Sequence, residues 1–509
     1  MRGYGRGAGV ARLALACAWL AAAACSRESG SAAGDAASAT RPDILVLLLD
    51  TTRADRLGFY GHAAPTSPQL DALAAQSRVF ERAIASANWT LPSHASLFTG
   101  LPAHRHGAVA AEGWLRDDCV TLAERLAGAG YQTYLFSANP FVSAEHNLAQ
   151  GFEVQEHPWQ GRWREQVRAY MEQRDYPGEP RQSQFAPFKD AGEVIRRGFA
   201  RWLAERDDAR PFFAFLNLME AHRPYYATRE ERLRFLSPEQ VERSIQMEHG
   251  YRERHAFGFG LHEYSPEDLA AVAGLYDAAL RHLDEIVGGI VRDLRDAGRL
   301  DHTLLVVTSD HGEHLGDQHR LGHEYSLYDA LIRVPLLLRY PPRIAAGRES
   351  RAVQQLDLHA TLLELAGLPR DPEDGGRSLL APADPAGAPR WLLSESLEPK
   401  RKPVDAVLRH YPNFDPTPWL RPLRSVERAG HKLIQAEGGP SELYEIERDP
   451  LELHDRFGER PELAAELAAG LAGLERGERA PAPAVEIDAE QRALLEELGY
   501  LGAGEGEAR

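Results

Sequence analysis

Two short apolar runs stand out in the hydrophobic pattern, and both end in side chains that bind metal ions well. Residues 44–49 form an unbroken apolar run that ends at Asp50, and residues 303–308 end just before Asp310 and His311. Runs of this length and composition are typical of strands buried on both faces. Because the carboxyl ends of parallel strands meet at one edge of an open α/β sheet, we expect Asp50, Asp310 and His311 to lie close together.

Helical and extended patterns alternate along much of the chain. The helical segments are 67–76, 121–129, 191–205 and 268–297, and the further strand segments are 131–136 and 212–218. This alternation predicts an α/β fold with a doubly wound sheet flanked by helices. Residues 153–190 are polar and show little periodicity. We therefore expect them to form a long insertion near the mouth of the site.

The amino-acid composition of the chain changes after residue 369. Pro, Gly and Asp cluster up to Pro389, and three strand patterns and one helical pattern follow, at 391–393, 431–434, 443–446 and 462–474. We predict a main domain over residues 41–369 and a C-terminal α+β subdomain over residues 370–509, built around a small antiparallel sheet. A final helix is expected near residues 488–501.

The N-terminus has the pattern of an export signal. Basic residues precede an apolar core at 13–24, which is too short to span a membrane as a mature helix. Small residues lead into Cys25, as in a bacterial lipobox, and residues 26–40 read as a flexible tether. We predict a signal peptide over 1–24, a tether over 25–40 with a lipid anchor at Cys25, and a location in the bacterial cell envelope, facing the periplasm or the cell surface. An ordinary signal peptide with an incidental Cys is the alternative.

The composition is that of a globular protein with an acidic balance. Apolar residues make up 43% of the 509 positions, and the formal net charge at pH 7 is −17. This charge argues against nucleic acid or an anionic membrane surface as the main partner. The lipid anchor would be the only contact with a membrane. An anionic substrate would then need a local positive site, supplied by a metal ion or by His and Arg side chains.

The segment 88–100 is a loop that leads into a helix, which we expect to begin near Ser93. Thr90 would lie just outside the helix N-terminus, a place that favours negative charge. Its hydroxyl is either a helix cap or a nucleophile, and coordination to a divalent metal would lower its pKa enough for the second role. Asp50, Asp310 and His311 would complete that metal site.

A second group of candidates is formed by Glu220, His222 and His323. Glu220 and His222 follow the strand segment 212–218, and His323 follows the Asp310 segment. This group would hold a second metal ion or bind the oxygen atoms of a substrate.

Short motifs of different sequence are spread over most of the chain. They are Pro42-Asp43-Ile44, Asp50-Thr51-Thr52-Arg53-Ala54-Asp55, the Thr90 loop, Ser309-Asp310-His311-Gly312-Glu313, His323, Ser326-Leu327-Tyr328-Asp329, Arg333-Val334-Pro335-Leu336, Leu443-Tyr444-Glu445-Ile446 and Asp449-Pro450. Together they resemble the sulfatase family of the alkaline phosphatase superfamily. The resemblance implies an alkaline-phosphatase-like mixed sheet flanked by helices, a small C-terminal subdomain, and a hydrolase that acts on ester bonds.

The nucleophile position departs from that family. Sulfatases carry Cys or Ser in a C-x-P-S-R signature and convert it to formylglycine, whereas Thr90 stands here at the Cys position and His94 at the Arg position. Thr51 replaces a second Asp ligand, and His311 stands where many members have Asn. These changes resemble the relatives with a Thr nucleophile, which are the nucleotide pyrophosphatase/phosphodiesterases, the phosphoethanolamine transferases and the lipoteichoic acid synthases.

These considerations give a set of predicted site residues. The metal ligands are Asp50, Thr90, Asp310, His311, His323 and Glu220; the catalytic residues are Thr90, His222 and His323; the substrate contacts are His94 and His222. Zn or Mn best suits carboxylate and imidazole ligands, Ca or Mg is the alternative, and one or two ions are expected.

The expected activity is hydrolysis of a phosphate mono- or diester through a phospho-threonine intermediate, with an anionic ester of the cell envelope as substrate. One alternative is hydrolysis of a sulfate ester. A second is transfer of a phosphoethanolamine-type group. A third is a catalytically silent lipoprotein that binds an anionic envelope component, which the retained hydroxyl and ligand set argue against because binding alone needs no activated nucleophile.

Overall fold

The fold is seen in a computed structural model. It describes residues 41–110, 112–177, 186–247, 251–371, 373–382 and 389–474, together with positions 489, 492, 493 and 495. The predicted signal peptide, the tether with Cys25 and most of the predicted final helix lie outside these residues. Within the described ranges, no helix combines the length and the apolar character that crossing a membrane requires.

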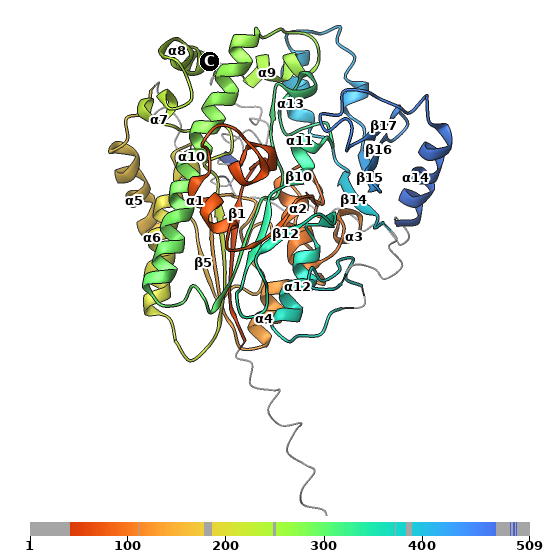
Figure 1. The fold of residues 1–509 in the computed structure, drawn as a ribbon. Helices are drawn as coiled ribbons and strands as arrows, with labels where there is room; N and C mark the ends of the chain where they lie inside the picture. The colour runs from red at the N-terminus through yellow and green to blue at the C-terminus, as the bar shows by residue number, and fades with distance from the viewer. Residues whose placement is uncertain are drawn as a thin grey trace, which may run out of the picture. The chain divides into compact units, whose positions relative to one another are not determined.

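An eight-stranded mixed sheet forms the centre of the fold (Figure 1). In spatial order its strands are β12 (Gly347–Glu349), β2 (Arg78–Phe80), β11 (Leu336–Arg339), β7 (Thr303–Thr308), β1 (Asp43–Leu49), β6 (Phe212–Leu218), β4 (Gln132–Ser137) and β5 (Val154–Glu156). The five strands from β7 to β5 are parallel, and β11 runs antiparallel to both of its neighbours. The predicted mixed α/β sheet is confirmed.

The central strand β1 separates two hydrophobic cores because successive side chains of a strand point to opposite faces. Ile44, Val46 and Leu48 pack into one core, and Leu45, Leu47 and Leu49 pack into the other. All six are buried, which explains why the run is apolar at every position rather than at alternate ones.

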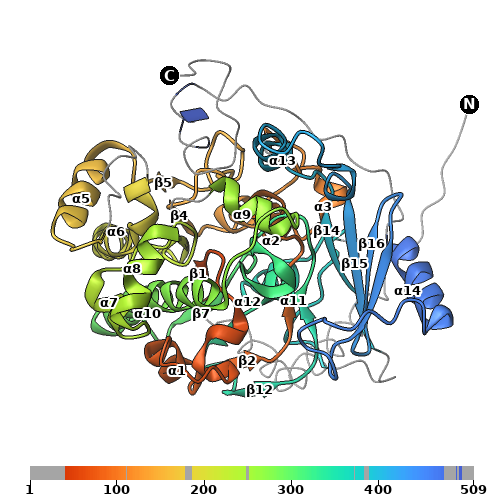
Figure 2. The same cartoon turned by 90° about the horizontal axis from the view of Figure 1, so that it is seen from above.

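Helices cover both faces of the sheet (Figure 2). The helices on the first face are α2 (Thr90–Thr99), α4 (Leu122–Gly128) and α12 (Asp357–Leu365), and those on the second are α1 (Pro68–Ala74), α6 (Gly192–Glu205) and α10 (Pro266–Asp296). Thr121 and Ser265 begin α4 and α10 with capping boxes, in which Thr or Ser and the acidic residue three positions later satisfy each other's backbone N–H groups. The four predicted helices correspond to α1, α4, α6 and α10.

Three segments differ from the sequence-based expectation. The segment 153–190 contains α5 (Gly161–Glu172), which buries Trp163 and Val167, so part of the predicted irregular insertion is helical. Helices α8 (Pro238–Met247) and α9 (Tyr251–Gly258) are not among the predicted helices. Helix α2 begins at Thr90 rather than near Ser93, because Pro92 in the first turn needs no hydrogen-bond acceptor for its nitrogen.

Short elements complete the main part of the fold. They are the small sheet β10 (Arg333–Val334), β3 (Ala83–Ile84) and β13 (Val353–Gln354), the pair β8 (His314–Leu315) and β9 (Leu321–Gly322), and the helices α3 (Ala103–His106), α7 (Arg229–Leu233), α11 (Asp329–Ile332) and α13 (Arg401–Leu408). They connect the sheet and its helices to the C-terminal region.

The C-terminal region contains a second, four-stranded antiparallel sheet. Its order is β14 (Leu392–Ser396), β15 (Leu423–Arg428), β16 (His431–Ala436) and β17 (Ser441–Glu445), and α14 (Pro461–Leu474) packs against it. The predicted antiparallel sheet and helix are present. Strand β15 was not predicted because its sequence lacks an apolar run. Among its residues, only Ser425, Val426 and Glu427 are buried.

A buried network of charges ties this second sheet to the main part of the fold. The Lys432 ammonium lies 3.0 Å from Asp329 Oδ1 and 2.7 Å from Glu452 Oε1. Arg82 joins the network by pairing with Asp329 and Glu427. Since Lys432 is fully buried, the pairing compensates charges that could not otherwise stay out of water.

Replacing Lys432 with Met should therefore destabilise the protein. The change leaves Asp329 and Glu452 buried with less positive charge, which we expect to lower the free energy of unfolding by about 3–5 kcal/mol. Urea denaturation of the variant measures this. The matched control is Arg448→Ala, which removes an exposed ion pair with Glu445 and should leave the midpoint unchanged within error; equal stability of the two variants would contradict the structural role of the network.

Candidate active site

The predicted site residues gather at the carboxyl edge of the main sheet. Asp50 follows β1, Asp310 and His311 follow β7, and Asn217 lies near the end of β6. Leu48 is paired with Thr308 on one side and with Asn217 on the other, so these parallel strands end at the same level. The ligand-rich edge is therefore a consequence of parallel pairing, as in other open α/β sheets.

Asp50, Asp310 and His311 form a group that fits a metal ion. One ligand atom from each lies within 4.8 Å of the others, and all three residues are buried. Asp50 Oδ1, Asp310 Oδ2 and His311 Nε2 have no hydrogen-bond partner among the described residues. Buried polar atoms that converge without partners are costly, and two carboxylates with an imidazole are a donor set that divalent cations prefer.

The electrostatics of this group also call for a cation. Burial raises the pKa of Asp50 to about 6. Burial, with Asp50 nearby, raises the pKa of Asp310 well above its ordinary value. Burial lowers the pKa of His311 well below its ordinary value, so its ring is neutral and able to coordinate. A divalent ion would supply the missing positive charge and hold both carboxylates ionised.

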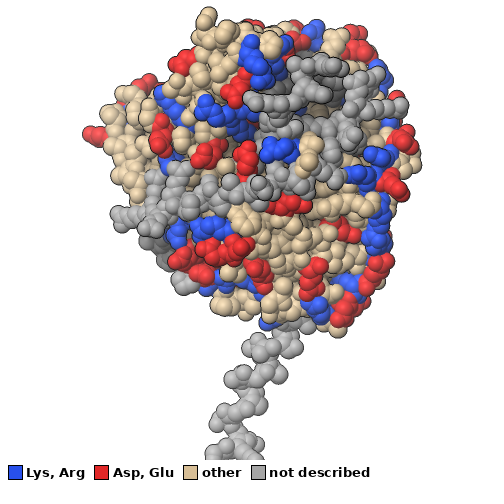
Figure 3. Space-filling model, turned by 180° about the vertical axis from the view of Figure 1, so that it is seen from behind, with Lys and Arg blue, Asp and Glu red and all other residues tan. Residues whose placement is uncertain are grey.

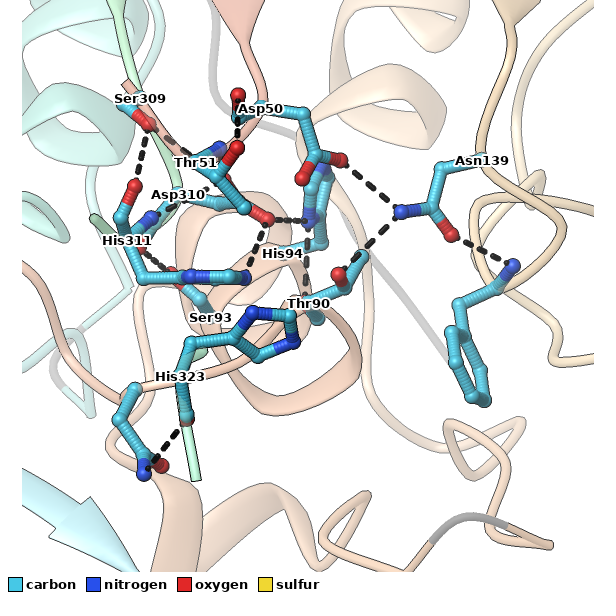
Figure 4. Close-up of polar contacts among 12 residues, drawn as sticks. Asp50, Thr51, Thr90, Ser93, His94, Asn139, Ser309, Asp310, His311 and His323 are labelled. Atoms are coloured by element: carbon cyan, nitrogen blue, oxygen red, sulfur yellow. Dashed lines mark hydrogen bonds and ion pairs between the residues drawn. The ribbon is translucent and has the colours of Figure 1, made fainter. Parts of the chain in front are cut away.

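The Thr90 hydroxyl lies beside this group (Figure 4). Asn139 Nδ2 donates to Thr90 Oγ1 at 3.2 Å and to Asp50 Oδ2 at 2.9 Å, so one amide holds the hydroxyl next to the carboxylate. Thr90 is the first residue of α2, and the flanking cap position is Trp89. The hydroxyl is thus directed into the site at the positive end of the helix, rather than back to the helix as a cap.

His311 and His323 present the same nitrogen to the site. Their ring centroids are 4.6 Å apart. His311 Nδ1 lies 2.9 Å from the Gly312 carbonyl oxygen, and His323 Nδ1 lies 3.1 Å from Glu313 Oε1. Because these oxygens accept, Nδ1 carries the ring proton in both residues, and Nε2 is left with a lone pair.

His222 completes a row of three imidazoles but has a different neighbour. Its ring centroid is 5.2 Å from that of His323. Its Nδ1 lies 3.0 Å from the Lys189 Nζ and 2.6 Å from the Arg223 carbonyl oxygen. Burial, together with the Lys189 charge, lowers the pKa of His222 well below its ordinary value. The structure thus brings His222 and His323 together beside the ligand group.

Glu220 and His94 have contacts that separate them from the ligand group. Glu220 Oε1 accepts a hydrogen bond of 2.6 Å from the Gly192 backbone at the start of α6, and Glu220 is not part of the cluster of converging ligand atoms. His94 Nδ1 donates to the Thr90 carbonyl oxygen at 2.9 Å and lies 3.7 Å from Asp310 Oδ2. These contacts favour a supporting role for His94 over the predicted substrate contact.

The side chain of Thr51 is also turned away from the ligand group. Its hydroxyl lies 2.7 Å from the carbonyl oxygens of both Asp50 and Ala221, and its backbone N–H reaches Asp310 Oδ1 at 3.3 Å. The backbone has a φ of 55°, which is unusual for a β-branched residue. Thr51 therefore fixes the turn that carries Asp50 and does not supply a ligand.

Three important side chains were missed from the sequence. Asn139 follows strand β4, and Asn217 lies at the end of strand β6. The strand-end argument that selected Asp50 would also have found Asn139. Lys189 lies in a segment without periodicity and gave no signal. Only the tertiary structure brings it against His222.

The fold and the cluster at the strand ends together define an ester hydrolase with an alkaline-phosphatase-like sheet. The sulfatase profile matches residues 42–368, and the profile of the C-terminal region of N-sulphoglucosamine sulphohydrolase matches residues 317–476. The chain belongs to the sulfatase family.

Known relatives agree with this assignment. The choline-sulfatase of Rhizobium meliloti (strain 1021) is 25% identical over 449 residues, which cover 81% of this chain and 82% of that protein. Arylsulfatase K of Bos taurus is 24% identical over 463 residues, which cover 84% of this chain and 80% of that protein. The phosphonate monoester hydrolase of Agrobacterium radiobacter has the same fold, with a TM-score of 0.67, 24% identity and coverage of 85% of this chain and 95% of that one.

Removing the Asn139 amide tests the geometry of the site. Asn139→Ala frees both Asp50 and Thr90, so we expect the affinity for a divalent metal to fall by roughly 10- to 100-fold. Metal titration followed by calorimetry measures the loss. The matched control is Asn147→Ala, whose amide bonds Leu115 and Asp117 instead; a similar loss in that variant would show that the effect is not specific to the site.

Proposed function

We propose that the protein is a metal-dependent hydrolase that cleaves phosphate mono- or diesters with Thr90 as the nucleophile. The proposal rests on the position of the Thr90 hydroxyl. The Asn139 amide nitrogen lies 3.2 Å from this hydroxyl and 2.9 Å from the Asp50 carboxylate, so it holds the two groups side by side. A threonine cannot enter the formylglycine chemistry expected of sulfatases with Cys or Ser at this position. An alcohol nucleophile with an adjacent metal site is suited to attack at phosphorus.

Asp50, Asp310 and His311 would hold the metal ion, with Thr90 next to them. Zn or Mn suits this mixture of carboxylate and imidazole. When bound, the ion would lower the pKa of the Thr90 hydroxyl and attract the negative charge of the ester. The unpartnered atoms Asp50 Oδ1, Asp310 Oδ2 and His311 Nε2 are the ones available for it.

In the first step, the Thr90 hydroxyl loses its proton to solvent, its oxygen attacks phosphorus, and the bond to the leaving oxygen breaks, which produces a phospho-threonine. Asn139 keeps the hydroxyl in place, and the N-terminus of α2 stabilises negative charge on the phosphoryl oxygens. His222 lies in the row of imidazoles beside the Lys189 ammonium, and it would stabilise the leaving oxygen.

In the second step, water takes the phosphoryl group from Thr90. His323 is suited to remove a proton from this water because its Nε2 is buried and has no partner among the described residues. Glu313 orients the ring through Nδ1 at 3.1 Å and stabilises the positive charge that the ring gains. The pair therefore has the arrangement of a carboxylate-supported general base.

Positive side chains support an anionic substrate. Four cationic side chains lie near the histidines, namely Lys189, Arg223, Arg254 and Lys400. Their charges interact with one another and with the carboxylates of Glu313 or Glu324. Elsewhere, acidic and basic side chains are interspersed on the face shown in Figure 3. These cations lie among the carboxylates of Asp50, Glu313 and Glu324, so positive charge is available locally although the net charge of the chain is negative.

Sulfate ester hydrolysis is the second candidate function. It is favoured by the match to the sulfatase profile over residues 42–368 and by relatives named as sulfatases. Sulfate and phosphate esters share tetrahedral geometry and negative oxygens, so the same cations and the same ligand group would bind either. The two esters differ in how readily an alcohol nucleophile, without formylglycine, can cleave them.

We also propose that the protein is exported and anchored in the bacterial cell envelope. The support is the N-terminal sequence, in which basic residues, an apolar core and small residues precede Cys25. A Ser-, Gly- and Ala-rich tether of residues 26–40 would let the folded part stand away from the membrane.

Replacing Thr90 should abolish catalysis without disturbing the fold. We expect Thr90→Ala and the similarly shaped Thr90→Val to lower kcat by at least about 10⁴-fold, since they remove the nucleophile. The measurement is turnover of aryl phosphate monoester, aryl phosphate diester and aryl sulfate by the metal-loaded protein. Thermal unfolding serves as the control for folding.

Each result of this assay has a definite meaning. Thr90-dependent turnover of a phosphate ester, well above that of the sulfate, supports the proposal. Dominant turnover of the sulfate would replace it by the second candidate. Full activity of Thr90→Ala on phosphate would rule out threonine as the nucleophile, and loss of activity in EDTA with recovery on adding Zn or Mn would establish the need for metal.

Replacing Cys25 tests the anchor. We expect the natural chain to partition into the detergent phase of a Triton X-114 extract, and Cys25→Ser to move to the aqueous phase because it cannot be acylated. Cys119→Ser is the control, since Cys119 is a buried thiol within the folded part. Aqueous partitioning of the natural chain would contradict lipidation.

A further inference from the structure

Arg53 joins the two chain segments that carry the metal-ligand group. It follows Asp50 closely in the sequence and is 4% exposed. Each of the N–H groups of its guanidinium has an oxygen acceptor. Two bonds go to the Asp55 carboxylate at 2.9 Å and 2.8 Å, two go to the Asp317 carboxylate at 2.5 Å and 3.2 Å, and one goes to the Glu313 carbonyl oxygen at 2.9 Å. The guanidinium thus holds the segment after β1 to the segment after β7.

The stem of Arg53 packs against the backbone that orients His311. A Cβ atom added to Gly312 would lie 3.2 Å from Arg53 Cγ and 2.1 Å from the Ala330 carbonyl oxygen, so only glycine fits between them. The Gly312 carbonyl oxygen lies 2.9 Å from His311 Nδ1. Because this contact leaves Nε2 available to a metal ion, Arg53 supports the peptide that aims one of the ligands.

Tyr276 holds the same turn from helix α10. Its buried hydroxyl accepts from the Arg53 backbone N–H at 2.9 Å and donates to the Thr51 carbonyl oxygen at 2.8 Å. Thr51 has a φ of 55°, a conformation that a β-branched residue adopts only when its surroundings enforce it. The turn that presents Asp50 is therefore fixed both by α10 and by the segment after β7.

The contacts of Arg53 extend to the support of His323. The main chain of Glu313 accepts from Arg53, and the side chain of Glu313 lies 3.1 Å from His323 Nδ1. A displacement of Arg53 would therefore shift Glu313 as well as the turn after β1. The two halves of the ligand group and the imidazole beside them share one support.

We propose that Arg53 and Tyr276 set the spacing between Asp50 and the pair Asp310 and His311, and thereby determine how tightly the site binds its metal ion. This inference rests on the proposed function, which places a divalent ion at this group. Both are positioning residues that act through the segments they join. The physical reason is that ligand atoms on separate segments must be held to within about 0.5 Å of the required geometry, while two neighbouring carboxylates repel each other.

Replacing Arg53 tests the spacing directly. We expect Arg53→Met to raise the Kd for Zn or Mn by roughly 10- to 100-fold, measured by calorimetric titration of the full chain. Arg82→Met is the matched control, because Arg82 also lies between two carboxylates, those of Asp329 and Glu427. Its Kd should change by less than about threefold, since sites without shared contacts do not couple. Urea denaturation of both variants shows whether they lose similar stability.

Two further readings separate positioning from a general loss of stability. Arg53→Lys keeps the charge, but an ammonium cannot reach both carboxylates and the carbonyl oxygen with the geometry of a guanidinium, so its Kd should stay at least about tenfold weaker than that of the natural chain. The visible absorption spectrum of bound Co²⁺ reports the arrangement of its ligands. It should change in Arg53→Met and stay the same in Arg82→Met; an unchanged spectrum in Arg53→Met would contradict the inference.

Tyr276→Phe covers the case in which the buried arginine variants fold poorly. It removes one hydroxyl, and we expect a Kd about tenfold weaker. Tyr60→Phe is its control, since the Tyr60 hydroxyl likewise donates to a carbonyl oxygen, that of Phe80, and accepts from a backbone N–H, that of Leu336.

The outcomes distinguish this inference from the proposed function. Unchanged metal affinity in Arg53→Met or in Tyr276→Phe, or equal weakening in the matched controls, would overturn the role of Arg53 and Tyr276. If the natural chain binds no divalent ion, the proposed function fails. If it binds the ion and the variants bind it equally well, only the positioning role fails.

Discussion

Two buried carboxylates at the ends of adjacent parallel strands set the conditions for the whole site. Asp50 and Asp310 are both fully buried, and burial raises the pKa of each. Such a pair is stable as anions only beside compensating positive charge. The Asn139 amide and the backbone N–H groups of Thr51 and His311 supply part of it through hydrogen bonds. A divalent ion would supply the further compensation that the two carboxylates need.

Hydrogen-bond partners fix the orientation of three neighbouring histidines. His311 and His323 place Nδ1 against oxygen acceptors and therefore leave a lone pair on Nε2. His222 Nδ1 lies 2.6 Å from the Arg223 carbonyl oxygen and 3.0 Å from the Lys189 ammonium, so this ring also meets a positive charge. The group on one nitrogen of a histidine decides what the other nitrogen can do.

The departures from the sulfatase pattern are mutually consistent. Thr90 replaces a side chain that must be oxidised, and its neighbour Asn139 holds it as an alcohol. His94, at the place of an arginine, is neutral because burial lowers its pKa to about 4. Thr51, at the place of an acidic ligand, uses its hydroxyl on backbone oxygens. Fewer charged side chains therefore surround Thr90, which is consistent with the proposed unmodified hydroxyl beside one metal ion.

The sequence by itself determined the central strands and the first metal ligands. Residues 44–49 and 304–307 are apolar at every position because they are buried on both faces, and a polar residue that follows the end of such a strand lies at the sheet edge. Helices α6 and α10 were also predictable from the spacing of their apolar residues. Strand β15 and helix α5 were not, because their burial depends on partners distant in the chain.

Only the tertiary structure decided how the site works. Lys189 and His222 are 33 positions apart, and Asn139 and Thr90 are 49 apart, so no local pattern connects them. The start of α2 at Thr90 and the tautomers of the histidines were likewise settled by packing and by long-range hydrogen bonds. Local sequence reports burial and secondary structure, whereas the direction of a hydrogen bond depends on which segments the fold brings together.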